Sequence, residues 1–155
     1  MIPQIGDFVA VALVAAKIIN ALNNSRGSKS EFISILHTLT ALSQALWRAE
    51  QLWIDYQTTR NETLFNDKRR QQSINAIATD MNRERDECTV LMAQFMEDLK
   101  SYKKAFLHPD ASLGRQVVRK LSWIGEKERI ASFEKRLHGH LKAFEMHLGA
   151  FYWFV

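Results

Sequence analysis

The chain has 155 residues, of which 46% are hydrophobic and 25% are charged, as in a soluble globular protein of about one domain. Six glycines and two prolines are too few for the turns of an all-β sandwich or barrel. The single cysteine, Cys88, excludes a disulfide framework and a cysteine-built zinc site, and it fits a reducing compartment. We therefore expect one cytoplasmic domain built from helices.

The formal net charge of +4 is unevenly distributed along the chain. Residues 1–99 carry a net charge of −2, whereas residues 100–142 hold 11 basic and 4 acidic residues, a net charge of +7. Such a basic face can meet anionic lipid, nucleic acid or an acidic protein surface, or it can be a solvated helix face. The aromatic residues of this stretch fall mostly at core spacing and no nucleic-acid-reading motif is present, so we expect no nucleic-acid partner.

The first predicted helix, residues 5–23, is apolar on every side between Asp7 and Lys17. Such a helix is buried on every side or enters lipid. Fifteen residues would reach roughly 22 Å, short of the roughly 30 Å hydrocarbon core, so a permanent single span is not expected. No lysine or arginine precedes the apolar run, which argues against a signal peptide. Two interpretations stay open: a central helix wrapped by the others, or a helix that packs in one state and enters a membrane in another.

The second predicted helix, residues 29–57, follows a capping-box pattern at residues 28–31. Its apolar residues alternate in spacing between three and four, which predicts one buried stripe. The stripe consists of Phe32, Ile35, Leu39, Leu42, Leu46, Ala49, Trp53 and Tyr56.

The third predicted helix, residues 68–107, has a similar stripe that is interrupted at Glu84 and Arg85, and Pro109 must end the helix. We interpret the charges at residues 83–87 as pairs three and four residues apart on an exposed face. The stripe consists of Ile74, Ile77, Met81, Cys88, Leu91, Phe95, Leu99, Tyr102 and Phe106.

A short helix at 114–124, ended by Gly125, is predicted to precede a last helix at 126–152. Long stripes joined by short loops predict an all-α fold, an antiparallel four-helix-type bundle with a hydrophobic N-terminal helix and one short extra helix. The stripe of the last helix consists of Ile130, Phe133, Leu137, Leu141, Phe144, Leu148 and Phe151.

No motif of an enzyme site is present: the chain lacks a phosphate-binding glycine loop, a nucleophile elbow and a His-Glu-x-x-His sequence. His138 and His140 fall on different helix faces, and His140 and His147 have no acidic or cysteine partner at ligand spacing. We therefore expect no catalytic residue, no metal site and no cofactor. Cys88 lies on an apolar stripe and is interpreted as an unreactive core residue.

Several segments spread over nearly the whole chain are similar to one family. They are MIPQIGDFVAV at 1–11, FISILHTL at 32–39, RKLSWI at 119–124, EKE at 126–128 and LHGHL at 137–141. Together they resemble the HeLo-like domains at the N-terminus of fungal NACHT-type receptors and related multidomain proteins. That group is compared with the four-helix bundle of the mixed lineage kinase domain-like necroptosis effector and with the helical domains of plant helper immune receptors.

The resemblance implies a cell-death effector domain whose first helix inserts into membranes after oligomerisation. Some family members are instead expected to be homotypic or heterotypic interaction modules without membrane activity. The aromatic residues near the ends of two predicted helices, among them Trp47 and Trp153, would suit such contacts. The membrane-inserting residues carried over from the matching first helix are Asp7, Phe8, Val9, Val11, Leu13 and Val14.

The expected partners are further copies of the chain, anionic membrane lipids and a downstream domain of the same chain. The apolar residues 151–155 suggest a domain excised from the N-terminus of a longer protein. Recruitment from the cytoplasm to the plasma membrane would begin at the basic stretch, because basic side chains are attracted to anionic headgroups. The residues expected to lead that encounter are Arg115, Arg119, Lys120 and Lys127.

Overall fold

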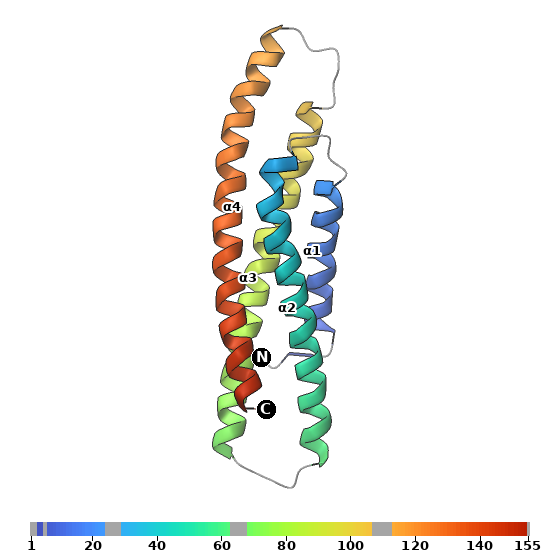
Figure 1. Cartoon of the computed structure of the whole chain (residues 1–155), viewed down its shortest axis with the longest axis vertical. Helices are drawn as coiled ribbons and strands as arrows, with labels where there is room; N and C mark the ends of the chain where they lie inside the picture. The colour runs from blue at the N-terminus through green and yellow to red at the C-terminus, as the bar shows by residue number, and fades with distance from the viewer. Residues whose placement is uncertain (1–2, 5, 24–28, 63–67, 107–112, 155) are drawn as a thin grey trace.

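The computed structural model has four α-helices lying along one long axis (Figure 1). They are α1 (Asp7–Asn23), α2 (Lys29–Glu62), α3 (Lys68–Phe106) and α4 (Leu113–Phe154). The structure describes the backbone of residues 3–4, 6–23, 29–62, 68–106 and 113–154, and the side chains of residues 3–4, 6–23, 32–58, 68–98 and 128–154. Within these ranges the chain is all-helical and contains no strand, as its hydrophobic periodicity predicts.

The helices pack as two pairs, α1 with α2 and α3 with α4, and chain direction reverses at each connection (Figure 1). The pairs meet where α2 packs on α4 and α1 packs on α3. Side-chain contacts show that α2 and α4 run in the same direction, because Ser34 bonds Glu134 while Trp53 contacts Phe151 further along both helices. In their described parts α2 and α3, although successive in sequence, are not neighbours, so they lie diagonally across the bundle.

The predicted stripes form the core. All eight stripe residues of α2 and all seven of α4 are buried. On α3, Ile77 is half-buried, whereas Leu99, Tyr102 and Phe106 fall outside the described side chains. The remaining stripe residues of α3 are buried, namely Ile74, Met81, Cys88, Leu91 and Phe95.

The break predicted at Gly125 is wrong. The helix α4 continues without interruption from Leu113 to Phe154, so residues 114–124 are its first turns rather than a separate short helix. A glycine inside a helix costs only about 1 kcal/mol relative to alanine. No proline follows Pro109, so nothing in this stretch removes a backbone donor and stops the helix.

The helix α1 lies at the surface of the bundle, so the first of the two interpretations, a central helix wrapped by the others, is not what the structure shows. Its outer face exposes Lys17 and leaves Leu13 with 55% of its surface accessible. A helix that packs on two neighbours buries only the stripe that faces them, even when its other face is also apolar. The buried stripe of α1 consists of Phe8, Val11, Ala12, Ala15, Ile18 and Leu22.

Among the described residues, no helix combines the length and the hydrophobicity needed to cross a membrane. The most apolar of the four, α1, has 17 residues and is therefore about 25 Å long.

Candidate functional site

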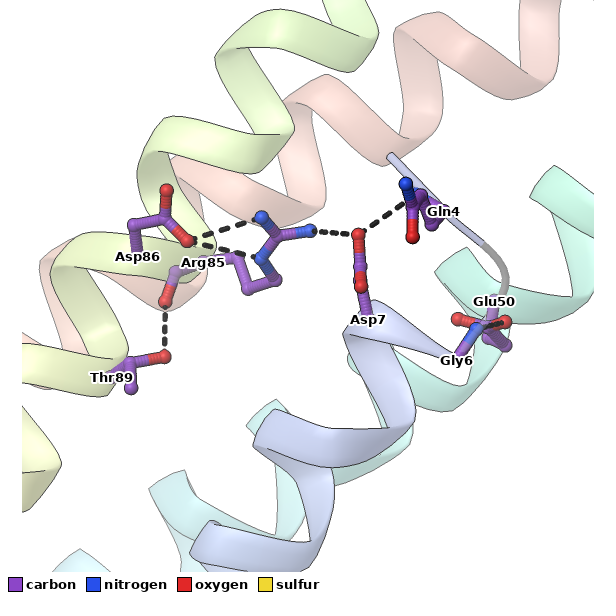
Figure 2. Close-up of polar contacts among 7 residues, drawn as sticks. All are labelled: Gln4, Gly6, Asp7, Glu50, Arg85, Asp86 and Thr89. Atoms are coloured by element: carbon purple, nitrogen blue, oxygen red, sulfur yellow. Dashed lines mark hydrogen bonds and ion pairs between the residues drawn. The ribbon is translucent and has the colours of Figure 1, made fainter. Parts of the chain in front are cut away.

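The first turn of α1 is held by polar side chains from two other helices (Figure 2). We call Gly6, Asp7, Glu50 and Arg85 the α1 clamp. Gly6 has a φ of +97°, a conformation that favours glycine, and it directs the chain into the helix. The Asp7 carboxylate accepts a hydrogen bond of 2.8 Å from the Gln4 backbone N–H, and its negative charge lies at the positive end of the helix dipole.

Arg85 on α3 supplies the cation of the clamp. Its Nη1 lies 3.4 Å from Asp7 Oδ2, while its Nη2 and Nε lie 3.1 and 3.2 Å from Asp86 Oδ1. The side chain of Arg85 is only 10% exposed, whereas that of Asp7 is 39% exposed. Arg85 occupies a position on the stripe of α3 where an apolar residue is expected. Its guanidinium therefore points inward against α1 rather than outward to solvent.

Glu50 on α2 holds the backbone of the same turn. Its Oε1 accepts a hydrogen bond from the Gly6 backbone N–H (Figure 2). Glu50 is 2% exposed, and its Oε2 has no hydrogen-bond partner among the described residues. A buried polar atom without a partner costs about 1–3 kcal/mol. Glu50 therefore holds this turn with one carboxylate oxygen while the other stays buried without a described hydrogen-bond partner, which makes the turn a candidate for a regulated contact.

The residues predicted to insert into a membrane differ in how deeply the structure buries them. Asp7 belongs to the clamp, and Phe8 lies in the core with its ring edge-on to Phe144 of α4 at 5.9 Å between centroids. Val11 is also buried, whereas Leu13 is exposed. The other two, Val9 and Val14, are half-buried. In this state the apolar residues of α1 are thus mostly engaged in the bundle.

The four residues predicted to meet lipid headgroups lie on the first part of α4, but their side chains fall outside the described residues. These residues are Arg115, Arg119, Lys120 and Lys127.

Residues 84–87 do not form the exposed set of local pairs that the sequence suggests. Glu84 Oε2 lies 2.8 Å from His140 Nδ1 on α4, and Glu87 Oε2 lies 3.6 Å from the same nitrogen. No acidic residue lies at ligand spacing from His140 and His147 in the sequence, but the fold brings two glutamates of another helix to His140. The only sequence signal for this arrangement is that the two glutamates lie one helical turn apart. That spacing does not indicate that their partner is a histidine 53 residues further along the chain.

Cys88 is buried one turn beyond Glu84, as its apolar surroundings predict. Burial, together with the smaller effects of the negative charges of Glu84 and Glu87, raises the pKa of its thiol from 9.0 to about 12. The thiol therefore stays protonated near neutral pH, which makes it a poor nucleophile.

A groove of about 690 Å³ lies between α2 and α4. Its apolar lining includes Trp47, which is 47% exposed, and Tyr152, which is 71% exposed. Gly149 also lines the groove, and a methyl group added there would meet no atom within 4 Å. Large exposed aromatic residues beside a hollow are typical of surfaces that bind another molecule.

No protein-family model, curated protein or solved structure matches the chain.

Proposed function

We propose that the chain is an antiparallel, HeLo-like effector domain that promotes regulated cell death at the front of a fungal immune-type receptor. In this proposal the clamp holds α1 in the resting bundle, and its release lets α1 associate with a membrane after the domain oligomerises. The observation that supports the proposal is the convergence of Arg85 and Glu50, from two helices, on the first turn of the most apolar helix.

Release of α1 would free six buried apolar residues from the core. Burial of apolar surface is worth about 25 cal/mol per Å², so the freed face needs a new apolar environment. One α1 helix is too short to span the hydrocarbon core and carries Lys17, whereas several copies can shield their polar residues from lipid. Oligomerisation is therefore a necessary part of the mechanism, and basic residues of α4 would bring the domain to the anionic surface.

The membrane role can be tested by dye release from vesicles that contain phosphatidylserine, with Leu13→Glu as the decisive variant. Leu13 is 55% exposed, so glutamate there leaves the bundle folded. A charge on a helix that enters lipid costs about 2.5 kcal/mol or more, and we expect leakage to fall sharply. Val90 on α3 is 72% exposed, and Val90→Glu provides a matched control that should leak like the unaltered chain. Equal leakage from both variants, or no leakage from the unaltered chain, would contradict a membrane role.

A second variant tests whether the clamp restrains α1 in the resting bundle. Replacing Arg85 by methionine removes the cation that faces Asp7 and should increase leakage. Arg83→Met is the control, because Arg83 is exposed and pairs with Asp80 on its own helix. Circular dichroism checks that both variants remain helical. If the two variants leak equally, the clamp does not restrain α1.

The groove between α2 and α4 favours a second candidate, a homotypic interaction module without membrane activity. Arg48 lines the wall from α2 and Glu145 lines the wall from α4. A twofold axis at the groove would place each arginine opposite the glutamate of the other copy, so the surface is complementary to itself. The exposed ring of Tyr152 would fill the apolar part of the partner's groove.

Light scattering across a range of concentrations tests this candidate. Tyr152→Ser should reduce self-association, because it removes an aromatic side chain from the groove. Met146→Ser is the control, since Met146 is an exposed apolar residue of the same helix that does not line the groove. A chain that stays monomeric at high concentration would exclude self-association through this surface.

A further inference from the structure

Three potential metal ligands from two helices converge beside the clamp. Glu84 and Glu87 lie one turn apart on α3, and His140 faces them from α4. One ligand atom from each residue can be chosen so that all three lie within 4.8 Å of one another. Carboxylate oxygen and imidazole nitrogen are both ordinary ligands of zinc, and three protein ligands with an open fourth position make a common zinc site.

The distances suit a tetrahedral ion. With bonds of about 2.1 Å, two ligand atoms of a tetrahedral zinc site lie about 3.4 Å apart. The His140 Nδ1 atom lies 2.8 Å from Glu84 Oε2 and 3.6 Å from Glu87 Oε2, so both separations are within an ångström of the required value. Small side-chain rotations would bring the three atoms around one ion.

The charges of the cluster also favour a divalent cation. A single imidazolium can balance only one of the two carboxylates, and a neutral imidazole balances neither. The ion pairs described for Glu84 and Glu87 are both with His140, whereas Arg85 pairs with Asp7 and Asp86. The side chain of Glu84 is 13% exposed, so its charge is poorly solvated. A bound zinc ion would neutralise both carboxylates at once.

The surrounding packing fixes the two helices in register on either side of the cluster. Toward one end, Phe95 of α3 stacks on Phe133 of α4 with 3.9 Å between ring centroids. Toward the other end, Arg70 Nε donates a hydrogen bond of 2.6 Å to the Phe154 carbonyl. The backbone positions of the ligands are therefore set by the fold. The side chain of Glu87 is 51% exposed, which leaves access for the ion and for a water molecule as fourth ligand.

We propose that Glu84, Glu87 and His140 form a zinc site that ties α3 to α4. Binding requires a neutral imidazole, so the hydrogen bond between Glu84 and His140 is replaced by two bonds to the ion, and any proton on the imidazole is released to solvent. The site does not depend on the proposed function.

Isothermal titration of the chelator-treated full chain with zinc chloride tests the proposal. We expect one ion per chain, and a rise in Tm of roughly 5–10 °C at about a hundredfold excess of free zinc over Kd. Glu87→Gln should weaken binding by about tenfold or more, because it removes a ligand but keeps the side-chain shape. Asp86→Asn is the matched control: it neutralises the adjacent acidic residue, which pairs with Arg85, and should bind zinc like the unaltered chain.

His140→Gln tests the zinc site independently, by removing its only nitrogen ligand. His138→Gln is the control, since His138 is exposed and lies two residues away on the same helix. Circular dichroism without zinc checks that all variants are folded. We expect the His140 variant to lose the rise in Tm and the His138 variant to keep it. Absence of saturable zinc binding, or equal affinity in the Glu87 and Asp86 variants, would overturn the proposal.

Discussion

The guanidinium carbon of Arg85 lies 5.4 Å from the centre of the Phe8 ring, so the buried cation of α3 contacts the apolar anchor of α1. The same guanidinium is ion-paired with Asp7, the residue before Phe8. A desolvated cation over an aromatic ring can contribute about 2 kcal/mol. One side chain thus holds both the polar and the apolar parts of the first turn of α1.

This relationship predicts that Arg85→Met destabilises the bundle. Removing one partner of a fully buried ion pair costs about 3–5 kcal/mol. The Asp7 side chain is 39% exposed and regains water, so we expect a smaller loss, about 1–3 kcal/mol. Urea unfolding measures it. Arg83→Met, at a side chain that is 60% exposed, should change stability by no more than about 0.5 kcal/mol. Equal losses in the two variants would mean that the clamp does not stabilise the fold.

The packing of α1 by a single face predicts opposite outcomes for two large apolar residues. Phe8 is 1% exposed and reaches Phe144 across the core, so Phe8→Ala should cost about 3–5 kcal/mol. Leu13 is 55% exposed, and Leu13→Ala should cost no more than about 0.5 kcal/mol. Thermal unfolding of both variants compares the two faces directly. A large loss in the Leu13 variant would show that the outer face of α1 is also buried in solution.

The long stripes of α2 and α4 were the most predictable part of the fold. Their apolar residues recur every three or four positions, and only a helix with one buried face satisfies that spacing. The ends of the helices were harder to predict, as shown by α4, which continues as one helix through Gly125. A glycine lowers helix propensity without preventing a helix, so packing along the rest of α4 decides the outcome.

The candidate site was much harder to predict, because it depends on which helices become neighbours. Periodicity marks the position of Arg85 as unusual, but nothing local indicates that Asp7, 78 residues earlier, supplies its counter-charge. The pairing of His140 with Glu84 cannot be predicted from the sequence for the same reason. In α1, hydrophobicity alone could not show which face is buried, since every residue between Asp7 and Lys17 is apolar.

The burial of Cys88 predicts a pH-dependent contribution to stability. The pKa of its thiol is about 12 in the folded chain, against an ordinary value of 9.0 for an exposed thiol. As the pH rises from 9 towards 12, the unfolded chain loses this proton while the folded chain keeps it, so the free energy of unfolding falls. Below pH 9 the contribution is fully present.

Cys88→Ala isolates this effect, because lysines and tyrosines titrate in the same range in both proteins. The stability advantage of the unaltered chain over the alanine variant should shrink between pH 8.5 and about 11, as measured by urea unfolding. If the difference between the two chains is constant over this range, the thiol is not desolvated in the folded state.

The basic segment at the start of α4 predicts salt-sensitive binding to anionic vesicles. Arg115 and Arg119 are one helical turn apart, and Lys120 and Lys127 follow on the same helix. Each basic residue near an anionic surface contributes about 1 kcal/mol, so the four together contribute roughly 4 kcal/mol before screening. Changing all four to glutamate should abolish sedimentation with phosphatidylserine or phosphoinositide vesicles at low salt.

Net charge alone could produce the same loss, so the control must change charge equally elsewhere on α4. Four exposed basic residues in the later part of the helix provide it, and their replacement by glutamate alters the net charge by the same amount. If the first part of α4 forms the lipid site, this control retains more binding than the first variant at equal ionic strength, because the attraction decays within a Debye length of about 10 Å at 0.1 M salt. Undiminished binding of the first variant would exclude the segment as the lipid site. The control residues are Arg129, Lys135, Arg136 and Lys142.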